Sequence, residues 1–378
     1  MLVVADMLLS MSVYALIPVL PQWFLETEGL TPGQTGVAMG VFGLGLYLLG
    51  AQCSWLVQRF RRNVVCMWAV IAFALDLALL WYLDDVQSEA IEYGVILLQR
   101  LLLGAAFGLA QMVLSSTLII DTCESYQRTE ANHSAAWFAR FALALGPMAG
   151  LVAFRHYGFN GLIVVSVGCA LAGLVLIKLV RFPFRAPEDN LHVASLDRFL
   201  LLDGHVLFVN LLMVSTVMGL IFSLAFEPLF FAMMMGGFLL ALLAQRFVFR
   251  DAELKSEVVS GLLLLLAALI VMLAYPNDPV SAVLIGLGIG IVGSRFLLFF
   301  IKLSRHCKRG TSQSTYFLGW ETGIALGLAL GYSCFYGNDA SFYNQHDAQL
   351  TVAIILTAIA LAMYVFYTHS WFMRHKNR

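Results

Sequence analysis

The chain has 378 residues, of which 61% are hydrophobic and only 12% charged, and its formal net charge is -1. A soluble domain carries roughly 25% charged residues, so this composition excludes an ordinary soluble protein. It indicates a polytopic membrane protein that lies in the lipid bilayer. The near-neutral charge gives no reason to expect a nucleic-acid partner.

Long apolar runs follow one another from the start of the chain. A transmembrane helix needs about 20 apolar residues, and the sequence contains twelve such runs. Because the runs are long and continuously apolar, without the alternation of barrel strands, they predict an all-α membrane protein. They cover roughly residues 2–24, 33–57, 64–83, 93–119, 133–154, 159–180, 204–224, 228–247, 258–275, 279–303, 312–336 and 348–368.

Neither a cleavable signal peptide nor a cysteine framework is expected. The first apolar run lacks a basic leader and a small-residue cleavage site. The six cysteines are scattered and show no metal-ligand spacing. We therefore expect no disulfide, no metal and no cofactor.

Lysine and arginine gather in alternate connections between the runs. Of the 22 basic residues, 18 lie at the ends of runs two, four, six, eight and ten, in the connections after them or in the C-terminal tail. The positive-inside rule places such segments in the cytoplasm. Both termini are therefore expected on the cytoplasmic side of the plasma (inner) membrane.

The longest polar interruption, residues 181–203, follows the sixth run. It predicts a cytoplasmic linker between an N-terminal six-helix bundle, residues 1–180, and a C-terminal one, residues 204–378. Parallel six-helix repeats describe one large transporter architecture, and we expect the chain to act as a monomer. A shift of 181 positions supports the repeat, since it matches Arg128 with Arg309, Arg140 with Glu321, Gly146 with Gly327 and Gly150 with Gly331.

Several motifs resemble the major facilitator superfamily over nearly the whole chain. Residues 99–108, QRLLLGAAFG, are similar to its R-x-x-x-G-x-x-x-G signature on helix 4, and Asp6 precedes the P-V-L-P of residues 18–21 on helix 1. The stretch Gly146-Pro147-Met148-Ala149-Gly150 resembles the G-P-x-x-G motif of the proton-driven antiporters of that superfamily. The resemblance implies two six-helix bundles that rock about a central site.

The loop after the second run departs from the family pattern. Where the family has an acid, this chain has Gln58, and where it has a glycine, this chain has Arg61. Because the acid helps to latch the two halves together, that latch is in doubt here. We expect Arg59, Arg61 or the neighbouring Arg62 to act in this cytoplasmic loop, and a pairing of Arg59 or Arg61 with Asp121 or Glu124 is a hypothesis.

Two matched positions carry the main functional expectation. Arg140 lies about 10 Å inside the fifth run at 1.5 Å per residue, and Glu321 lies at a similar depth in the eleventh. A charged residue inside the membrane is functional by default, although Arg140 can also extend to the interface as an anchor. A carboxyl group at the depth of Glu321 is expected to bind and release a proton. A structural ion pair with an arginine is the alternative for Glu321.

Three more charged residues are candidates for proton coupling or substrate recognition. By resemblance, Arg100 takes part in coupling or contacts substrate; by its chemistry alone, it can bind Asp6, Asp76 or backbone carbonyls. Asp6 and Arg295 are candidates for the same cavity, with an inner-edge anchor as the alternative for Arg295.

Polar and small residues complete the expectation. Gln99, Asn210 and Trp320 are expected to line the cavity. Small residues let helix backbones approach closely in lipid, and Pro147 can bend its helix. The residues expected to act in packing or conformational change are Gly104, Gly108, Gly146, Pro147, Gly150, Gly327 and Gly331.

Together these features predict a secondary active transporter that moves a small organic solute, with protons as the coupling ion. Export by proton antiport is favoured by the helix 5 motif, and proton-coupled uptake of an anionic solute, such as a carboxylate or a sugar acid, is the alternative. An enzyme is not expected, because the eight histidines lie at or near run ends and none is paired with a carboxylate at reactive spacing. A passive channel or a sensor is the remaining class.

Overall fold

The computed structural model describes residues 1–85, 92–119, 128–182, 192–224, 226–249, 253–276, 279–305, 308–336 and 342–377. Helices occupy most of these ranges, and no strand occurs in them. The all-α prediction is confirmed.

The first part of the chain forms helices whose ends follow local capping chemistry. At the start of α3, Thr31 and Gln34 form a reciprocal capping box, and Pro32 occupies the first turn, where its missing N–H costs nothing. The elements are α1 Leu2–Tyr14, α2 Leu20–Glu26, α3 Pro32–Leu48, α4 Cys53–Arg59, α5 Arg62–Asp85, α6 Tyr93–Val113, the π-helix η1 Leu114–Leu118 and α8 Arg128–Leu179.

The second part repeats the pattern. Pro228 again starts a helix directly after Glu227, at the one break that the sequence marks between the seventh and eighth runs. The elements are the 3-10 turn η2 Leu202–Gly204, α9 His205–Phe222, α10 Pro228–Phe247, α11 Leu254–Ala274, α12 Pro279–Leu303, α13 Arg309–Leu330, η4 Gly331–Phe335, α14 Phe342–Met363, η5 Tyr364–Thr368 and α15 His369–His375.

Each of the twelve predicted runs coincides with helix. Eight described helices are long and apolar enough to cross a membrane, and the bent pair α3–α4 makes nine. The 52 residues of α8 are about 78 Å long at 1.5 Å per residue, more than two membrane thicknesses, and its backbone breaks at Gly158 (φ 65°, ψ -159°). It therefore provides two spans. The broken helix α1–α2 and the more polar α13 account for the remaining two runs.

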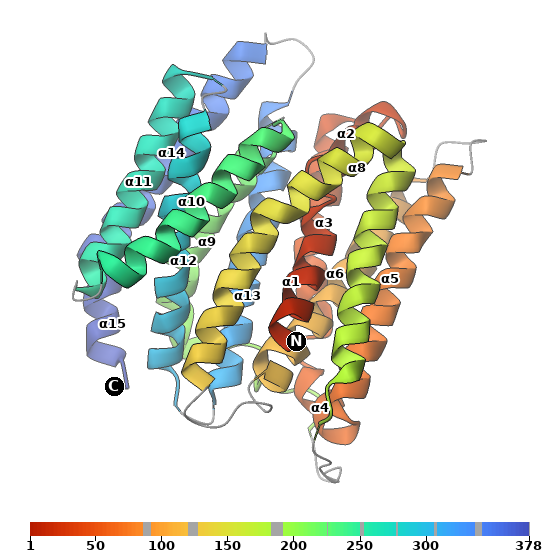
Figure 1. Ribbon diagram of the computed structural model, residues 1–378, viewed down its shortest axis with the longest axis horizontal. Helices are drawn as coiled ribbons and strands as arrows, with labels where there is room; N and C mark the ends of the chain where they lie inside the picture. The colour runs from red at the N-terminus through yellow and green to blue at the C-terminus, as the bar shows by residue number, and fades with distance from the viewer. Residues whose placement is uncertain are drawn as a thin grey trace.

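The two parts of the chain lie side by side. In Figure 1 the helices coloured red to lime are on the right and those coloured green to blue on the left, with α13 and the first part of α8 near the middle. The loops after α4 and α12 and the linker residues 192–204 lie at the lower end in this view. We call this end the linker side. The division into two bundles at residues 181–203 stays a prediction.

Glycines lie at several close approaches between helices of the same half. A Cβ atom at Gly104 would lie 2.2 Å from the carbonyl oxygen of Phe42, and one at Gly108 would lie 2.8 Å from that of Leu46. These contacts join α6 to α3. In the same way, Gly146 and Gly150 of α8 pack against the end of α1, and Gly327 of α13 and Gly331 of η4 pack against α9 and its C-cap residue Ser223. Pro147 lies inside α8 between its two glycines.

The close approach at Gly150 predicts a large effect of a side chain there. A Cβ atom would lie 2.2 Å from the carbonyl oxygen of Ala15, so Gly150→Leu should separate α8 from α1 and lower stability by about 1–3 kcal/mol or more. Thermal unfolding of purified protein in detergent measures this. The matched control is Gly168→Leu in the same helix, where a Cβ would meet nothing within 4 Å; equal destabilisation by both variants would contradict the packing role.

The linker is anchored to both halves on the linker side. Toward the first half, the backbone N–H of Ser195 donates to the carbonyl of Ala51 (2.9 Å). Toward the second, the N–H of Arg198 donates to the hydroxyl of Thr311 (2.8 Å) and the N–H of Leu201 to that of Thr315 (2.7 Å). The linker backbone thus connects the turn before α4 to α13 through hydrogen bonds that its N–H groups donate.

An acid of the linker lies near the loop after α4, the loop whose sequence departs from the family pattern. The Asp197 carboxylate accepts hydrogen bonds from Ser54 of α4 (3.4 Å) and Thr311 of α13 (3.1 Å). Gln58 and Arg59 end α4, and Arg62 begins α5. The hypothesis that Arg59 or Arg61 pairs with Asp121 or Glu124 lies outside the described residues, because both acids do. Asp197 is an acid that contacts both halves at this level.

The anchoring of the linker predicts an effect of Thr315→Val. The Thr315 hydroxyl is buried and accepts from the N–H of Leu201, so its removal leaves a buried donor unsatisfied and should cost about 1–3 kcal/mol. Chemical denaturation in detergent measures the loss. Thr357→Val is the control, because the Thr357 hydroxyl is also buried but bonds only to the Ala353 carbonyl of its own helix. A control effect as large as that of Thr315→Val would contradict the prediction.

Candidate functional site

A cavity lies between the two halves of the chain. Its walls come from α1, α6, η1, the first part of α8, α12 and α13. Most lining residues belong to the part of their helix nearer the linker side, and Tyr14 and Glu321 lie at the other end of the cavity, near the middle of the molecule. It is lined by Asp6, Ser10, Tyr14, Gln111, Ser115, Ala135, Ala136, Ala139, Arg140, Leu143, Leu297, Gln313, Tyr316, Phe317, Trp320 and Glu321.

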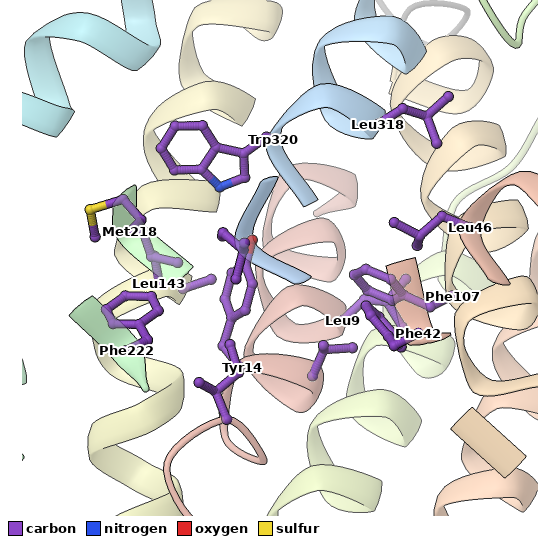
Figure 2. Packing of buried hydrophobic residues seen from close by; sticks show 14 of the residues in the cluster. Leu9, Tyr14, Phe42, Leu46, Phe107, Leu143, Met218, Phe222, Leu318 and Trp320 are labelled. Carbon is purple, nitrogen blue, oxygen red and sulfur yellow. The ribbon is translucent and has the colours of Figure 1, made fainter. Parts of the chain in front are cut away.

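Glu321 lies at the end of the cavity farther from the linker side and is bound by the other half. It is 4% exposed, and its carboxylate oxygen Oε1 accepts a short hydrogen bond from the hydroxyl of Tyr14. Figure 2 shows the hydroxyl end of Tyr14 directed toward the indole of Trp320. All of these side chains are buried. The contact therefore joins the last residue of α1 to the middle of α13 in apolar surroundings.

Arg140 lies on the same cavity and also contacts the opposite half. Its guanidinium donates to the hydroxyl of Tyr316 on α13 (3.2 Å) and to the carbonyl of Ala136 in its own helix. Gly293 of α12 provides the space for this group, because a Cβ atom there would lie 2.5 Å from an Arg140 nitrogen. The Arg140 carbon Cζ also lies 5.4 Å from the ring centroid of Trp137. The arginine is thus held by aromatic and neutral groups rather than by a carboxylate.

Asp6 is the third charged group of the cavity. It is 5% exposed, and its oxygen Oδ1 has no hydrogen-bond partner among the described residues. Nearby, the Gln111 amide donates to the hydroxyl of Ser10 (2.7 Å). Positions 6, 10 and 14 recur every four residues, so Asp6, Ser10 and Tyr14 form one polar stripe along α1.

Some of the lining residues were not among those that the sequence singled out. Tyr14, Gln111, Gln313 and Tyr316 all face the cavity, and Tyr14 and Tyr316 hold the two main charged groups. The four-residue spacing of polar groups in the first run was a usable signal for Tyr14. The two tyrosines are separated from their partners by 307 and 176 positions, so their pairing needed the folded structure.

Arg100 and Gln99 lie away from this cavity. The Arg100 nitrogen Nε donates to the carbonyl of Ala38 (3.4 Å), and its Cζ lies 5.1 Å from the Phe42 ring centroid. Gln99 donates to the Asp76 carboxylate (3.0 Å). Arg100 thus has the backbone carbonyl partner that its chemistry alone allowed. The expected depth of Arg100 along its helix does not determine which face of the helix the side chain occupies.

Arg295 and Asn210 also face other helices. Arg295 forms an ion pair of 2.5 Å with Glu257 of α11, a residue only 1% exposed. Asn210 donates to the carbonyl of Ala360 on α14 (3.0 Å). Neither lines the central cavity, where we expected them, because their partners lie within the second half of the chain. Trp320, by contrast, does lie in the cavity wall.

A membrane-embedded cavity between two helical halves, with charged side chains from both, defines a membrane transport protein. Comparison with family models then gives the family: residues 2–328 match the Major Facilitator Superfamily, and the chain belongs to it. No curated protein matches the chain by sequence. The resemblance seen in the motifs is thereby confirmed at the level of the superfamily, which is a family of transporters.

Solved structures of low sequence identity share the fold. A POT peptide transporter in complex with alafosfalin is 14% identical, with a TM-score of 0.69 over 100% of this chain and 95% of that one. The nucleoside transporter NupG is 12% identical, with a TM-score of 0.67 over 96% and 98%. A bacterial homologue of the iron transporter ferroportin, in an outward-facing state, is 13% identical, with a TM-score of 0.66 over 98% of each chain. At these identities the likeness concerns the fold.

The separate partners of Arg140 and Glu321 predict the result of a charge swap. Since Arg140 binds Tyr316 and Glu321 binds Tyr14, exchanging the two charges should not restore what either single change removes. The experiment compares Arg140→Glu, Glu321→Arg and the double variant for ligand binding and transport. Recovery in the double variant to more than half of the original activity would show a direct pair instead.

Proposed function

We propose that this transporter couples the movement of a small organic solute to protons, with Glu321 as the proton-binding group. The observation that carries the proposal is the position of Glu321: a buried carboxyl group whose one described hydrogen-bond partner is a tyrosine from the other half. Burial in apolar surroundings disfavours an ionised carboxylate. A group that gains and loses a proton there changes both the charge of the cavity and the contact between the halves.

Export in exchange for protons is the direction we propose. It rests on the G-P-x-x-G motif of residues 146–150, whose two glycines pack on the backbone of α1 next to Tyr14 and Ala15. The motif thus supports the helix that carries the Glu321 partner. Uptake of an anionic solute with protons is the alternative, and the specific observation that favours it is Arg140, a buried cation in the cavity that pairs with no carboxylate among the described residues.

We also propose that the linker side faces the cytoplasm and that the transporter works as a monomer in the plasma membrane. The basic residues of Arg59–Arg62, Lys302–Arg309 and Arg374–Lys376 flank the ends of spans on the linker side. This distribution is the one that the positive-inside rule associates with the cytoplasm.

Purified protein in liposomes with an imposed pH gradient tests the coupling. A panel of drugs, sugars, organic acids and amino acids is offered on either side, and pH-driven accumulation of at least one solute is expected. Failure to move any solute with either sign of the gradient would remove the proposal, and the sign that works decides between antiport and symport.

Glu321→Gln should abolish accumulation driven by the pH gradient, because an amide cannot release a proton, while exchange without a gradient continues. Asp76→Asn is the matched control: its carboxyl binds Gln99 outside the cavity, so gradient-driven accumulation should persist. If Glu321→Gln still accumulates solute at the original level, Glu321 is not the proton site.

A further inference from the structure

Three buried polar atoms of the cavity have no hydrogen-bond partner among the described residues. They are Oδ1 of Asp6, Nε of Arg140 and Oε1 of Gln313, and the three residues are no more than 5% exposed. Leaving such a group unsatisfied costs about 1–3 kcal/mol, and more when it is charged. Unsatisfied groups of this kind call for a specific explanation, and three on one cavity wall point to a ligand that supplies the missing partners.

The charges of the cavity are not neutralised by one another. Ion pairs among the described residues include Arg155 with Glu227, Arg198 with Asp197, Arg295 with Glu257 and His346 with Asp347. Asp6, Arg140 and Glu321 take part in none of them. The partners of Arg140 are a hydroxyl and a carbonyl, and the partner of Glu321 is a hydroxyl. Buried charges are normally paired. Among the described residues the cavity therefore offers a ligand one cation, Arg140, and two acids, Asp6 and Glu321, that take part in no ion pair.

A ligand with a single charge would leave part of this wall uncompensated. An anion would satisfy Arg140 and face the unpartnered oxygens of Asp6 and Gln313 with oxygens of its own. A cation would satisfy Asp6 and leave the buried guanidinium of Arg140 without a counter-charge. A ligand that carries both an anionic acceptor and a cationic donor satisfies all three atoms.

The size and walls of the cavity set further limits. The space open to the centre of a water-sized sphere is about 80 Å³, and since one water needs about 10–15 Å³ by this measure, the cavity accommodates roughly five to eight groups of that size. Tyr316, Phe317 and Trp320 provide aromatic surface. These dimensions fit a solute of the size of an amino acid, with a short apolar part.

We propose that the cavity binds a small zwitterion whose carboxylate lies at Arg140 and whose ammonium group lies at Asp6 and Gln313. The inference rests on the proposed function in taking this cavity as the transport site, and it names the class of solute. Glu321, which accepts a hydrogen bond from Tyr14, then remains available to bind the proton.

Binding to the purified full chain in detergent, at fixed pH and without a gradient, tests the proposal. The ligands are glycine, β-alanine, 4-aminobutyrate, 5-aminovalerate and 6-aminohexanoate, each compared with the carboxylate and the amine of the same carbon chain length. Isothermal titration calorimetry should show that at least one zwitterion binds tenfold or more tightly than both of its singly charged relatives. If a singly charged relative binds as tightly as every zwitterion, or if no zwitterion binds, the proposal is overturned.

Variants test whether Arg140 binds the carboxylate of the zwitterion and Asp6 its ammonium group. Arg140→Gln and Asp6→Asn should each weaken zwitterion binding at least tenfold, and Arg140→Gln should in addition remove any residual binding of the carboxylate while leaving that of the amine. Arg155→Gln and Asp76→Asn, which alter a cation and an acid outside the cavity, should leave binding unchanged. Size-exclusion profiles identify variants that fail to fold, and the Arg140→Lys and Asp6→Glu variants, which keep the charge, should then retain part of the affinity. Retained zwitterion affinity in a folded Arg140→Gln or Asp6→Asn variant would contradict the assignment.

The outcomes separate this proposal from the proposed function. A zwitterion that binds but is not moved by a pH gradient leaves the present inference intact and overturns proton coupling. If the protein binds no zwitterion but accumulates a singly charged solute with the gradient, proton coupling stands and the present inference is overturned.

Discussion

Helices in lipid are not drawn together by the hydrophobic effect, because lipid tails are as apolar as leucine side chains, so close packing must supply the attraction. In this protein, glycines supply it. The helix pairs α3–α6, α9–α13 and α10–α12 each bring two glycines into contact, at Gly45 with Gly104, Gly219 with Gly327 and Gly237 with Gly286. Gly150 against Ala15 adds the pair α8–α1. These backbone contacts pack helices closely within each half, where a few polar contacts, such as Gln99 with Asp76 and Arg295 with Glu257, add to them.

Because glycine packing stabilises each half from within, polar side chains are free to gather between the halves. The helix α13 combines both kinds of contact: glycine packing within its own half and polar contacts with the other half. One face carries Gly327 against α9, while Tyr316 and Glu321 reach α8 and α1 across the cavity. Most residues of α13 are buried among other helices, which is compatible with its polar composition. Because of that composition, α13 is not among the helices apolar enough to cross a membrane by themselves.

The sequence predicted where the helices lie better than it predicted which side chains contact one another. Run length and the break at Glu227-Pro228 were enough to place the spans, and the spacing of Gly146 and Gly150 was enough to identify a packing face. Depth also identified Arg140 and Glu321. It could not separate these two from Arg100, because depth is a one-dimensional property, whereas a cavity is defined by the face of the helix and by what the neighbouring helix presents. Tyrosines as partners were missed for the same reason.

Tyr14 is the last residue of α1, and the chain leaves regular α-helix over the next five positions before α2 begins at Leu20. Its hydroxyl donates to Glu321 across the boundary between the halves. A hydrogen bond to an ionised carboxylate is roughly twice as strong as one between neutral groups. If Glu321 is the proton-binding group, as we propose, its protonation would therefore weaken this contact between the halves. The same hydrogen bond would then link proton binding directly to the movement of the two halves.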